Sequence, residues 1–100
     1  MPKSLADLTQ DMHRFVGAKG WYAADSPRPQ TLRNLAVSLS IEAAELLEHV
    51  QREEQPADIR AWSRELADIL LYLLQLASLS QVDLETAVAE KLQDNYRRTW

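Results

Sequence analysis

The sequence predicts an all-α protein, and three observations favour this fold class. The chain has only two glycines and four prolines in 100 residues, so few positions interrupt helices. Alanine, leucine, glutamate and glutamine are abundant, and these residues have high helix propensity. Apolar residues recur every three or four positions, and no series of short β-branched strands is present. We therefore predict a single domain, residues 1–100, built as a bundle of four helices.

The first helix is expected to begin after Ser4, which is a good N-cap residue. It should end between Gly17 and Gly20, because glycine is common just beyond a helix C-terminus. Two prolines then predict an ordered loop over residues 21–30.

The second helix is expected to begin after Thr31 and to reach about Glu54. Pro56 separates it from a third helix, expected from about Ala57 to Leu79. A short connection of this kind predicts that the two helices pack side by side and antiparallel.

A Ser-Gln-Val break precedes the fourth helix, which Asp83 can cap and which should reach about Arg98. Glu85 lies in its first turn, and Arg97 and Arg98 lie in its last turn. This charge distribution is the one that the helix dipole favours.

Two acidic patterns, 23 residues apart, are the most informative motifs in the chain. Glu42 and Glu45 lie on the second helix, and Glu65 and Asp68 lie on the third, each pair three residues apart beside an apolar stripe. Asp68 is also the only charged residue between positions 66 and 79. The four carboxylates should converge if the two helices pack antiparallel. A single Glu-x-x-Glu is usually a solvated pair, but two pairs in register favour a site.

Such a cluster requires a cation or bound protons. Like charges about 4 Å apart repel by about 4 kcal/mol at an effective dielectric constant near 20, so without a cation at least one acid should be protonated. All-oxygen ligands favour Mg²⁺, with Mn²⁺ as a substitute. A di-iron site is disfavoured because neither His13 nor His49 stands three residues after a glutamate. Mg²⁺ usually shares its coordination with substrate phosphates, which predicts a phosphoanhydride substrate.

The third helix is apolar around most of its circumference. One stripe comprises Trp62, Leu66, Ile69, Leu70, Leu73 and Leu76. Leu71 and Leu74 fall on the opposite side, and a helix that is apolar all round is usually buried all round. Four helices in so short a chain can hardly cover it, so we predict a homodimer that buries this surface.

In this order and spacing, the acidic motifs and the Ile-Leu-Leu-Tyr-Leu-Leu run after Asp68 resemble the MazG-like nucleotide pyrophosphohydrolases. These belong to the all-α NTP pyrophosphatase superfamily, and the likeness is greatest to its dCTP-pyrophosphatase-like branch. Further matching motifs are Arg33-Asn34-Leu35, Val82-Asp83-Leu84 and Lys91-x-x-x-Asn95-x-x-Arg98. The resemblance implies a four-helix core completed as a homodimer or a dimer of dimers. It also implies Mg²⁺-dependent hydrolysis of a (deoxy)nucleoside triphosphate to the monophosphate and pyrophosphate, as in cleansing of the nucleotide pool.

The resemblance also assigns roles to individual residues. The metal ligands implied are Glu42, Glu45, Glu65 and Asp68. The residues implied near the phosphates are Lys91, Asn95 and Arg98, and those lining the nucleotide pocket are Asn34 and Tyr72. We expect Glu45 to act as the base that activates water. Trp21 could stack on a nucleobase or could anchor the loop over the core.

The chain departs from the family pattern at two places that help to form the base pocket. Gln30 stands near a position where related short members often have histidine, and Val50-Gln51-Arg52 replaces a common Phe-Gln-Trp. Specificity for dCTP therefore does not carry over. An alternative is a non-catalytic dimeric helical module that binds a nucleotide or a protein.

Composition argues against several other functions. The net charge of −4 and the lack of a basic helix disfavour nucleic acid as a partner. No apolar run reaches the roughly 18 residues of a membrane span, and the N-terminus lacks the apolar segment of a signal peptide. The chain has no cysteine, which excludes disulfides and thiolate metal sites. We expect a cytoplasmic protein.

Overall fold

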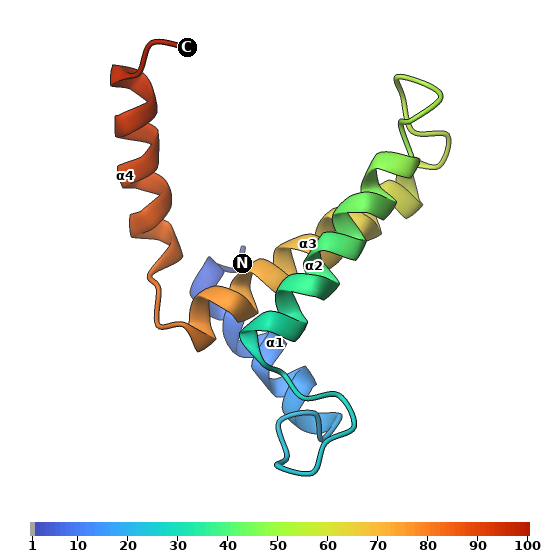
Figure 1. Ribbon diagram of the computed structural model, residues 1–100, viewed down its shortest axis with the longest axis vertical. Coiled ribbons are helices and arrows are strands. Elements are labelled where there is room, and N and C mark those ends of the chain that lie inside the picture. The colour runs from blue at the N-terminus through green and yellow to red at the C-terminus, as the bar shows by residue number, and fades with distance from the viewer. Residues whose placement is uncertain (1) are drawn as a thin grey trace.

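The computed structural model describes residues 2–100, and this part of the chain is helical with no strand. The helices are α1 (Leu5–Ala18), α2 (Leu32–Glu48), α3 (Ile59–Leu79) and α4 (Leu84–Arg97) (Figure 1). The predicted all-α class, the number of helices and their order are confirmed.

Each helix begins at a side chain that accepts hydrogen bonds from backbone N–H groups of the first turn. Ser4 and Asp7 form a reciprocal capping box at α1. At α2, the Thr31 side chain accepts a hydrogen bond from the backbone N–H of Asn34, and at α4 the Asp83 side chain accepts one from that of Thr86. Both caps were predicted from the sequence. The cap of α3 is Asp58, whose carboxylate accepts from two backbone N–H groups, so α3 begins after it and not at Ala57.

One predicted helix end is wrong. α2 ends at Glu48, with His49 as its C-cap, six residues before the predicted Glu54. The Gln-Arg-Glu-Glu-Gln stretch at residues 51–55 has no apolar side chain that could pack against α3, and packing supplies most of the stability of a helix in a protein. α4 ends at Arg97, within one residue of the predicted end, and Arg98 is its C-cap with extended backbone angles, φ −82° and ψ 137°.

α2 and α3 form a side-by-side pair, and α1 and α4 are each attached to this pair in a different way. α2 and α3 run alongside each other, and α1 packs against α3. α4 follows α3 after a bend of 103° and stands apart from the other three helices, shown in red in Figure 1. Within residues 2–100, no single helix is long and apolar enough to cross a membrane, whereas the bent pair of α3 and α4 passes that test only when the two are taken together.

The core is small and lies between α1, α2 and α3. The buried hydrophobic side chains of residues 2–100 are Met12, Val16, Leu35 and Leu74. Leu74 was expected on the face that a second chain covers, but α1 covers it and leaves it 2% exposed. The predicted core stripe of α3 is instead exposed at Leu66, Leu70 and Leu73. Sequence periodicity located two apolar faces on α3 but not which of them the chain itself covers.

The chain is more open than a compact monomer of its size. Its accessible surface is 7999 Å², whereas a folded monomer of 11.4 kDa exposes about 5,800 Å². Its radius of gyration is 15.9 Å, against about 13 Å for a compact domain of 100 residues. Exposed apolar side chains lie on all four helices, including Ile41 on α2 and Leu92 on α4. The single chain therefore leaves unburied a large apolar surface.

Candidate active site

Three glutamates from α2 and α3 meet at one place. Glu42 and Glu45 are three residues apart on one face of α2, and Glu65 lies on the part of α3 that packs beside them. One carboxylate oxygen from each residue lies within 4.8 Å of those of the other two. Glu42 and Glu65 are partly buried, whereas Glu45 is exposed.

The proximity of these acids changes the ionisation of Glu42. A hydrogen bond with Glu65 raises the pKa of Glu42 from 4.5 to about 8, and burial and the negative charges of Glu65 and Glu45 act in the same direction. At neutral pH and without a cation, the cluster therefore retains a proton on Glu42. This agrees with the expectation that at least one acid is protonated.

The donor set fits a hard divalent cation. Its ligands would be carboxylate oxygens from three residues, the type that Mg²⁺ and Mn²⁺ prefer. No Lys or Arg within residues 2–100 forms an ion pair with any of the three; the ion pairs in this part of the chain join Asp11 to Lys3 and to Arg14. A bound cation would supply the positive charge that the protein does not.

Asp68 lies outside the group of three. It is exposed, and it lines a neighbouring cavity together with Glu42. The structure thus brings together three of the four predicted carboxylates and places the fourth one turn further along α3, at the cavity wall. Its function as a metal ligand stays a prediction.

The cavity beside the acids, here called the Trp21 cavity, has a volume of about 340 Å³, within the range of small-molecule sites. Its lining comprises Leu8, Asp11, Met12, Phe15, Val16, Trp21, Arg28, Glu42, Asp68, Leu71, Tyr72 and Gln75. It therefore joins two of the acids to an aromatic and apolar region supplied by α1, the loop after it, and α3.

Trp21 anchors its loop, which is one of the two functions expected for it. Its ring makes an edge contact with Phe15, at 5.7 Å between centroids, and the Arg28 guanidinium lies 4.4 Å from the Trp21 centroid. These contacts fix the loop onto α1. The same side chain also lines the cavity, so it is available to a ligand.

Tyr72 lies between two cavities. It lines the Trp21 cavity and also a smaller one of about 230 Å³, which Asn34 lines as well. Asn34 Nδ2 donates a hydrogen bond of 3.0 Å to the backbone carbonyl of Pro29, so this side chain holds the loop before α2. Of this predicted pair, only Tyr72 lines the cavity that contains acids.

A further opening of about 350 Å³ lies on the other side of the acid cluster. Its lining comprises Glu45, Glu48, His49 and Glu65. The His49 ring packs edge-on against Trp62, with 6.0 Å between centroids. Sequence analysis gave neither Glu48 nor His49 a function. The i, i+4 spacing of Glu45 and His49 is the signal that could have identified the histidine.

The basic residues predicted near the phosphates do not reach the acids within one chain. Lys91 is exposed on α4, which lacks extensive contact with α1, α2 or α3. Asn95 is partly buried, and its Oδ1 is the buried side-chain oxygen in residues 2–100 that has no hydrogen-bond partner. The Arg98 guanidinium stacks 4.0 Å from the centroid of Trp100, a residue to which the sequence assigned no function.

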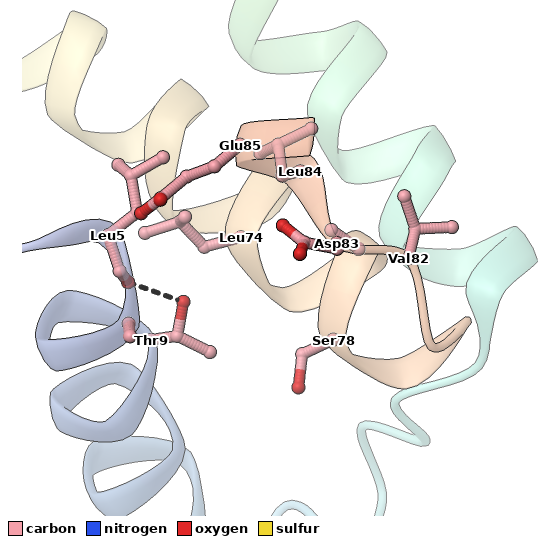
Figure 2. A pocket seen from close by; sticks show the side chains of 10 residues that line it. Leu5, Thr9, Leu74, Ser78, Val82, Asp83, Leu84 and Glu85 are labelled. Atoms are coloured by element: carbon pink, nitrogen blue, oxygen red, sulfur yellow. Dashed lines mark hydrogen bonds between the residues drawn. The ribbon is translucent and has the colours of Figure 1, made fainter. Parts of the chain in front are cut away.

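Another cavity, of about 440 Å³, lies elsewhere, where α1 and α3 meet the start of α4 (Figure 2). Most of its polar side chains already serve the fold. Thr9 Oγ1 donates to the Leu5 carbonyl at 2.7 Å, the Asp83 carboxylate caps α4, and Ser78 Oγ contacts a histidine nitrogen. The acid cluster is therefore the stronger candidate site.

Comparison with known proteins agrees with this geometry. Residues 30–99 match the model of the MazG nucleotide pyrophosphohydrolase domain. The chain belongs to this family. It is similar to dCTP pyrophosphatase 1 of Bos taurus, with 35% identity over 105 residues, and to that of Homo sapiens, with 32% over 104 residues. Each alignment covers 95% of this chain but 59% and 58% of those proteins, so this MazG chain spans about three fifths of their length.

A solved structure also shares the fold. A pyrophosphatase from Archaeoglobus fulgidus DSM 4304 superposes with a TM-score of 0.75 at 31% sequence identity. The superposition covers 97% of this MazG chain and 93% of that one. All three clustered glutamates, Asp68 and Tyr72 lie within the matched residues 30–99, whereas Trp21 lies before them.

Proposed function

We propose that this MazG domain hydrolyses (deoxy)nucleoside triphosphates to the monophosphate and pyrophosphate with Mg²⁺, which Mn²⁺ can replace. The observation that carries this proposal is the cluster of Glu42, Glu45 and Glu65 at the side of the Trp21 cavity. A hard cation held by these glutamates would lie next to a cavity of the size and aromatic character that suit a nucleoside.

Each residue has a function in this proposal. The clustered glutamates, together with Asp68, would hold the cation, which lowers the pKa of a bound water and neutralises the phosphates. Glu45 is the exposed member, so its carboxylate is free to accept the proton of the attacking water. Tyr72 and Trp21 would hold the base and sugar. Hydrolysis between the α- and β-phosphates then gives the monophosphate and pyrophosphate.

We further propose that the domain functions as a homodimer or a dimer of dimers. The chain exposes roughly 2,200 Å² more surface than a compact monomer of its mass, an area of the size that obligate interfaces bury. α4 stands apart from its own acid cluster. In such a dimer Lys91, Asn95 and Arg98 would approach the acids and phosphates of the second copy.

The experiment that tests the activity is a product analysis. The protein is incubated with Mg²⁺ or Mn²⁺ and a panel of canonical and modified dNTPs and NTPs, and the products are separated by ion-exchange chromatography. Monophosphate and pyrophosphate are expected, and a Glu65→Gln variant prepared in parallel should form neither. Diphosphate and phosphate would contradict the proposed position of cleavage. A preference for modified nucleotides in the panel would support a function in cleansing the nucleotide pool.

The alternative is a non-catalytic dimeric module that binds a nucleotide or a protein. The exposed apolar surface favours it, because that surface would be explained by assembly alone. Under this alternative Mg²⁺ should leave the melting temperature unchanged. Under the enzyme proposal, the melting temperature should rise with the Mg²⁺ concentration, because the cation binds only the folded state.

A further inference from the structure

Gln75 is the buried polar side chain of the core, and the Trp21 cavity borders it. It lies on α3 and is 3% exposed. Its Nε2 atom donates two hydrogen bonds, one of 2.9 Å to Gln30 Oε1 and one of 3.2 Å to the hydroxyl oxygen of Tyr22. Both bonds leave from the same atom, so the orientation of the Gln75 amide depends on what these two partners can accept.

Gln30 fixes that orientation from one side. Gln30 Nε2 donates a hydrogen bond of 2.7 Å to the backbone carbonyl of Arg28, and a carbonyl can only accept. The Gln30 amide group must therefore present its oxygen to Gln75. If the Gln75 amide were turned over, its oxygen would face the Gln30 oxygen. The Gln75 NH₂ group consequently faces Gln30.

Tyr22 is compatible with the same orientation from the other side. Its hydroxyl lies 2.6 Å from His13 Nδ1, and His13 Nε2 lies 2.7 Å from Ser78 Oγ. With the oxygen of Tyr22 accepting from Gln75, its hydrogen is free to donate to His13 Nδ1. The other ring nitrogen then donates to Ser78, so each group in the network has a suitable partner.

The remaining polar atom of this side chain is Gln75 Oε1, and it accepts no hydrogen bond from residues 2–100. Gln75 Oε1 is not fully buried either, because the fully buried side-chain oxygen that lacks a hydrogen-bond partner in residues 2–100 belongs to Asn95. Gln75 lines the Trp21 cavity, so a ligand in that cavity can reach the side chain that carries this unpaired acceptor. It can pair only with a ligand group that donates.

The position of Gln75 suits contact with a nucleobase. Asp68, Tyr72 and Gln75 follow one another at i, i+4 and i+7 on one face of α3, and all three line the cavity. Seven residues of helix span about 10 Å, so Asp68 and Gln75 are separated by about the length of a nucleoside monophosphate. With the α-phosphate beside Asp68, the base reaches Gln75; this step rests on the proposed function.

We propose that Gln75 Oε1 is a specificity-determining acceptor that selects nucleobases with an exocyclic amino group, cytosine and adenine, over their keto counterparts, uracil and hypoxanthine. An amino group donates a hydrogen bond to this oxygen. A keto oxygen at the same position would face it lone pair to lone pair and leave both atoms unpaired. A missed hydrogen bond in a buried site of this kind lowers kcat/KM by about 10- to 100-fold.

The test compares two matched substrate pairs, dCTP with dUTP and dATP with dITP, each differing in the amino or keto group. In the unmodified protein, kcat/KM should favour the amino member of both pairs by at least about tenfold. Gln75→Met keeps the length of the side chain and removes the acceptor, so both ratios should fall to near one. Gln10→Met, on an exposed position of α1, is the control and should keep both ratios.

A general packing defect would lower both rates but not their ratio, so the ratio separates a specificity function from a structural one. Gln30→Met removes the group that orients the Gln75 amide and should reduce the ratios while Gln75 remains. This variant also answers the question if Gln75→Met does not fold. Ratios near one in the unmodified protein, or unchanged in Gln75→Met, would overturn the inference.

Calorimetric binding of the non-hydrolysable α,β-methylene analogues of dCTP and dUTP separates this inference from the proposed activity. Tighter binding of the dCTP analogue, without turnover of any triphosphate, would support the function of Gln75 and overturn the hydrolase proposal. Turnover with equal preference would do the reverse. No binding and no turnover would overturn both.

Discussion

The hairpin of α2 and α3 and the isolated helix α4 differ in how much of the candidate site one chain can assemble. The hairpin brings Glu42, Glu45 and Glu65 to within 4.8 Å of one another without help from another molecule. α4 holds the predicted phosphate-binding residues but makes no extensive contact with the hairpin. One part of the site is therefore complete within the chain, and the other depends on assembly.

This difference follows from the connections. Residues 49–58 are a short link that returns α3 along α2, so the spacing of acids on each helix fixes where they meet. The link to α4 turns the chain by 103° at Gln81, a non-glycine residue with φ +60°, and directs α4 away from the hairpin. Motif spacing within a hairpin specifies a site, whereas spacing along a helix that leaves the hairpin does not.

The largest effect is expected from a substitution in the part of the site that lies in the hairpin. Glu42→Gln removes a charge but retains the shape of the side chain, and the cation would lose one ligand. We expect kcat/KM to fall by about 10²- to 10⁴-fold, because stabilisation of the phosphates by the metal is lost. Measured without metal near neutral pH, the melting temperature should not fall, since Glu42 is already protonated there and glutamine is also neutral. Mg²⁺ should no longer raise it.

Glu85→Gln on α4 is the matched control for this variant. Glu85 lies in the first turn of α4 and lines the cavity of Figure 2, away from the acid cluster. Its loss should leave kcat/KM within about twofold, because it contacts neither cation nor substrate in the proposal. Full activity of Glu42→Gln would remove the basis for the metal site.

The second prediction tests whether α4 acts on the second copy. Glu42→Gln and Lys91→Ala should each be inactive as a purified homodimer. After unfolding and refolding as an equal mixture, half of the dimers contain one chain of each kind. In each mixed dimer one site has both an intact acid cluster and an intact α4. We therefore expect recovery of about one quarter of the unmodified activity, measured as pyrophosphate release.

Mixing Glu42→Gln with Glu65→Gln provides the control. Both residues come from one hairpin, so no mixed dimer contains an intact acid cluster, and no recovery is expected. Absence of recovery in the Glu42→Gln and Lys91→Ala mixture would show that Lys91 serves the acid cluster of its own chain, whereas an active Lys91→Ala homodimer would show that Lys91 has no part in catalysis.

The third prediction uses the protonation of the hairpin cluster. The pKa of Glu42 is about 8 in the folded chain and has an ordinary value of 4.5. Between these values the folded state binds more protons than the unfolded state, so the free energy of unfolding without metal should fall as pH rises from about 4.5 to about 8. Urea unfolding at a series of pH values measures this, and Glu42→Gln should weaken the dependence.

Mg²⁺ binding should oppose the fall in the free energy of unfolding at higher pH. Mg²⁺ replaces the proton on Glu42, so its binding should release protons near neutral pH and become weaker as the pH falls. Calorimetry in two buffers of different ionisation enthalpy counts the protons released. Binding of Mg²⁺ with no proton release at neutral pH would contradict the protonated state of Glu42.

The sequence was a good guide to features that depend on local spacing. Ser4, Thr31 and Asp83 were identified as caps because a cap depends on its own first turn. The pairing of the two acidic motifs followed from helical periodicity and a short connection. The family resemblance, now supported by the match over residues 30–99, identified the same acids.

Features that depend on which surfaces meet were not predictable in the same way. Periodicity could not distinguish Leu74, which α1 covers, from Leu73, which is exposed. Nor could it show that Asp68 lies outside the cluster of three glutamates. Gln75 was overlooked because a single amide within a leucine-rich helix has no motif; only its three-dimensional partners reveal a fixed acceptor.

The smallest effects are expected from substitutions of the helix caps, which compare the stability of the hairpin with that of α4. Asp58 caps α3 in the hairpin, and Asp83 caps α4. In the dimer, Asp58→Ala and Asp83→Ala should each cost about 1 kcal/mol, or about 4–8 °C in melting temperature. Leu73→Glu, on the exposed face of α3, should yield a monomer, which sedimentation would verify.

In that monomer the two caps should no longer be equivalent. α3 is part of the packed core, so Asp58→Ala should still lower the melting temperature of Leu73→Glu. α4 makes little contact with the rest of a single chain, so its fraying precedes global unfolding and Asp83→Ala should leave that temperature unchanged. In the same monomer, Asp83→Ala should speed amide hydrogen exchange in α4 alone. An equal loss from both caps in the monomer would show that α4 is part of the cooperative unit of one chain.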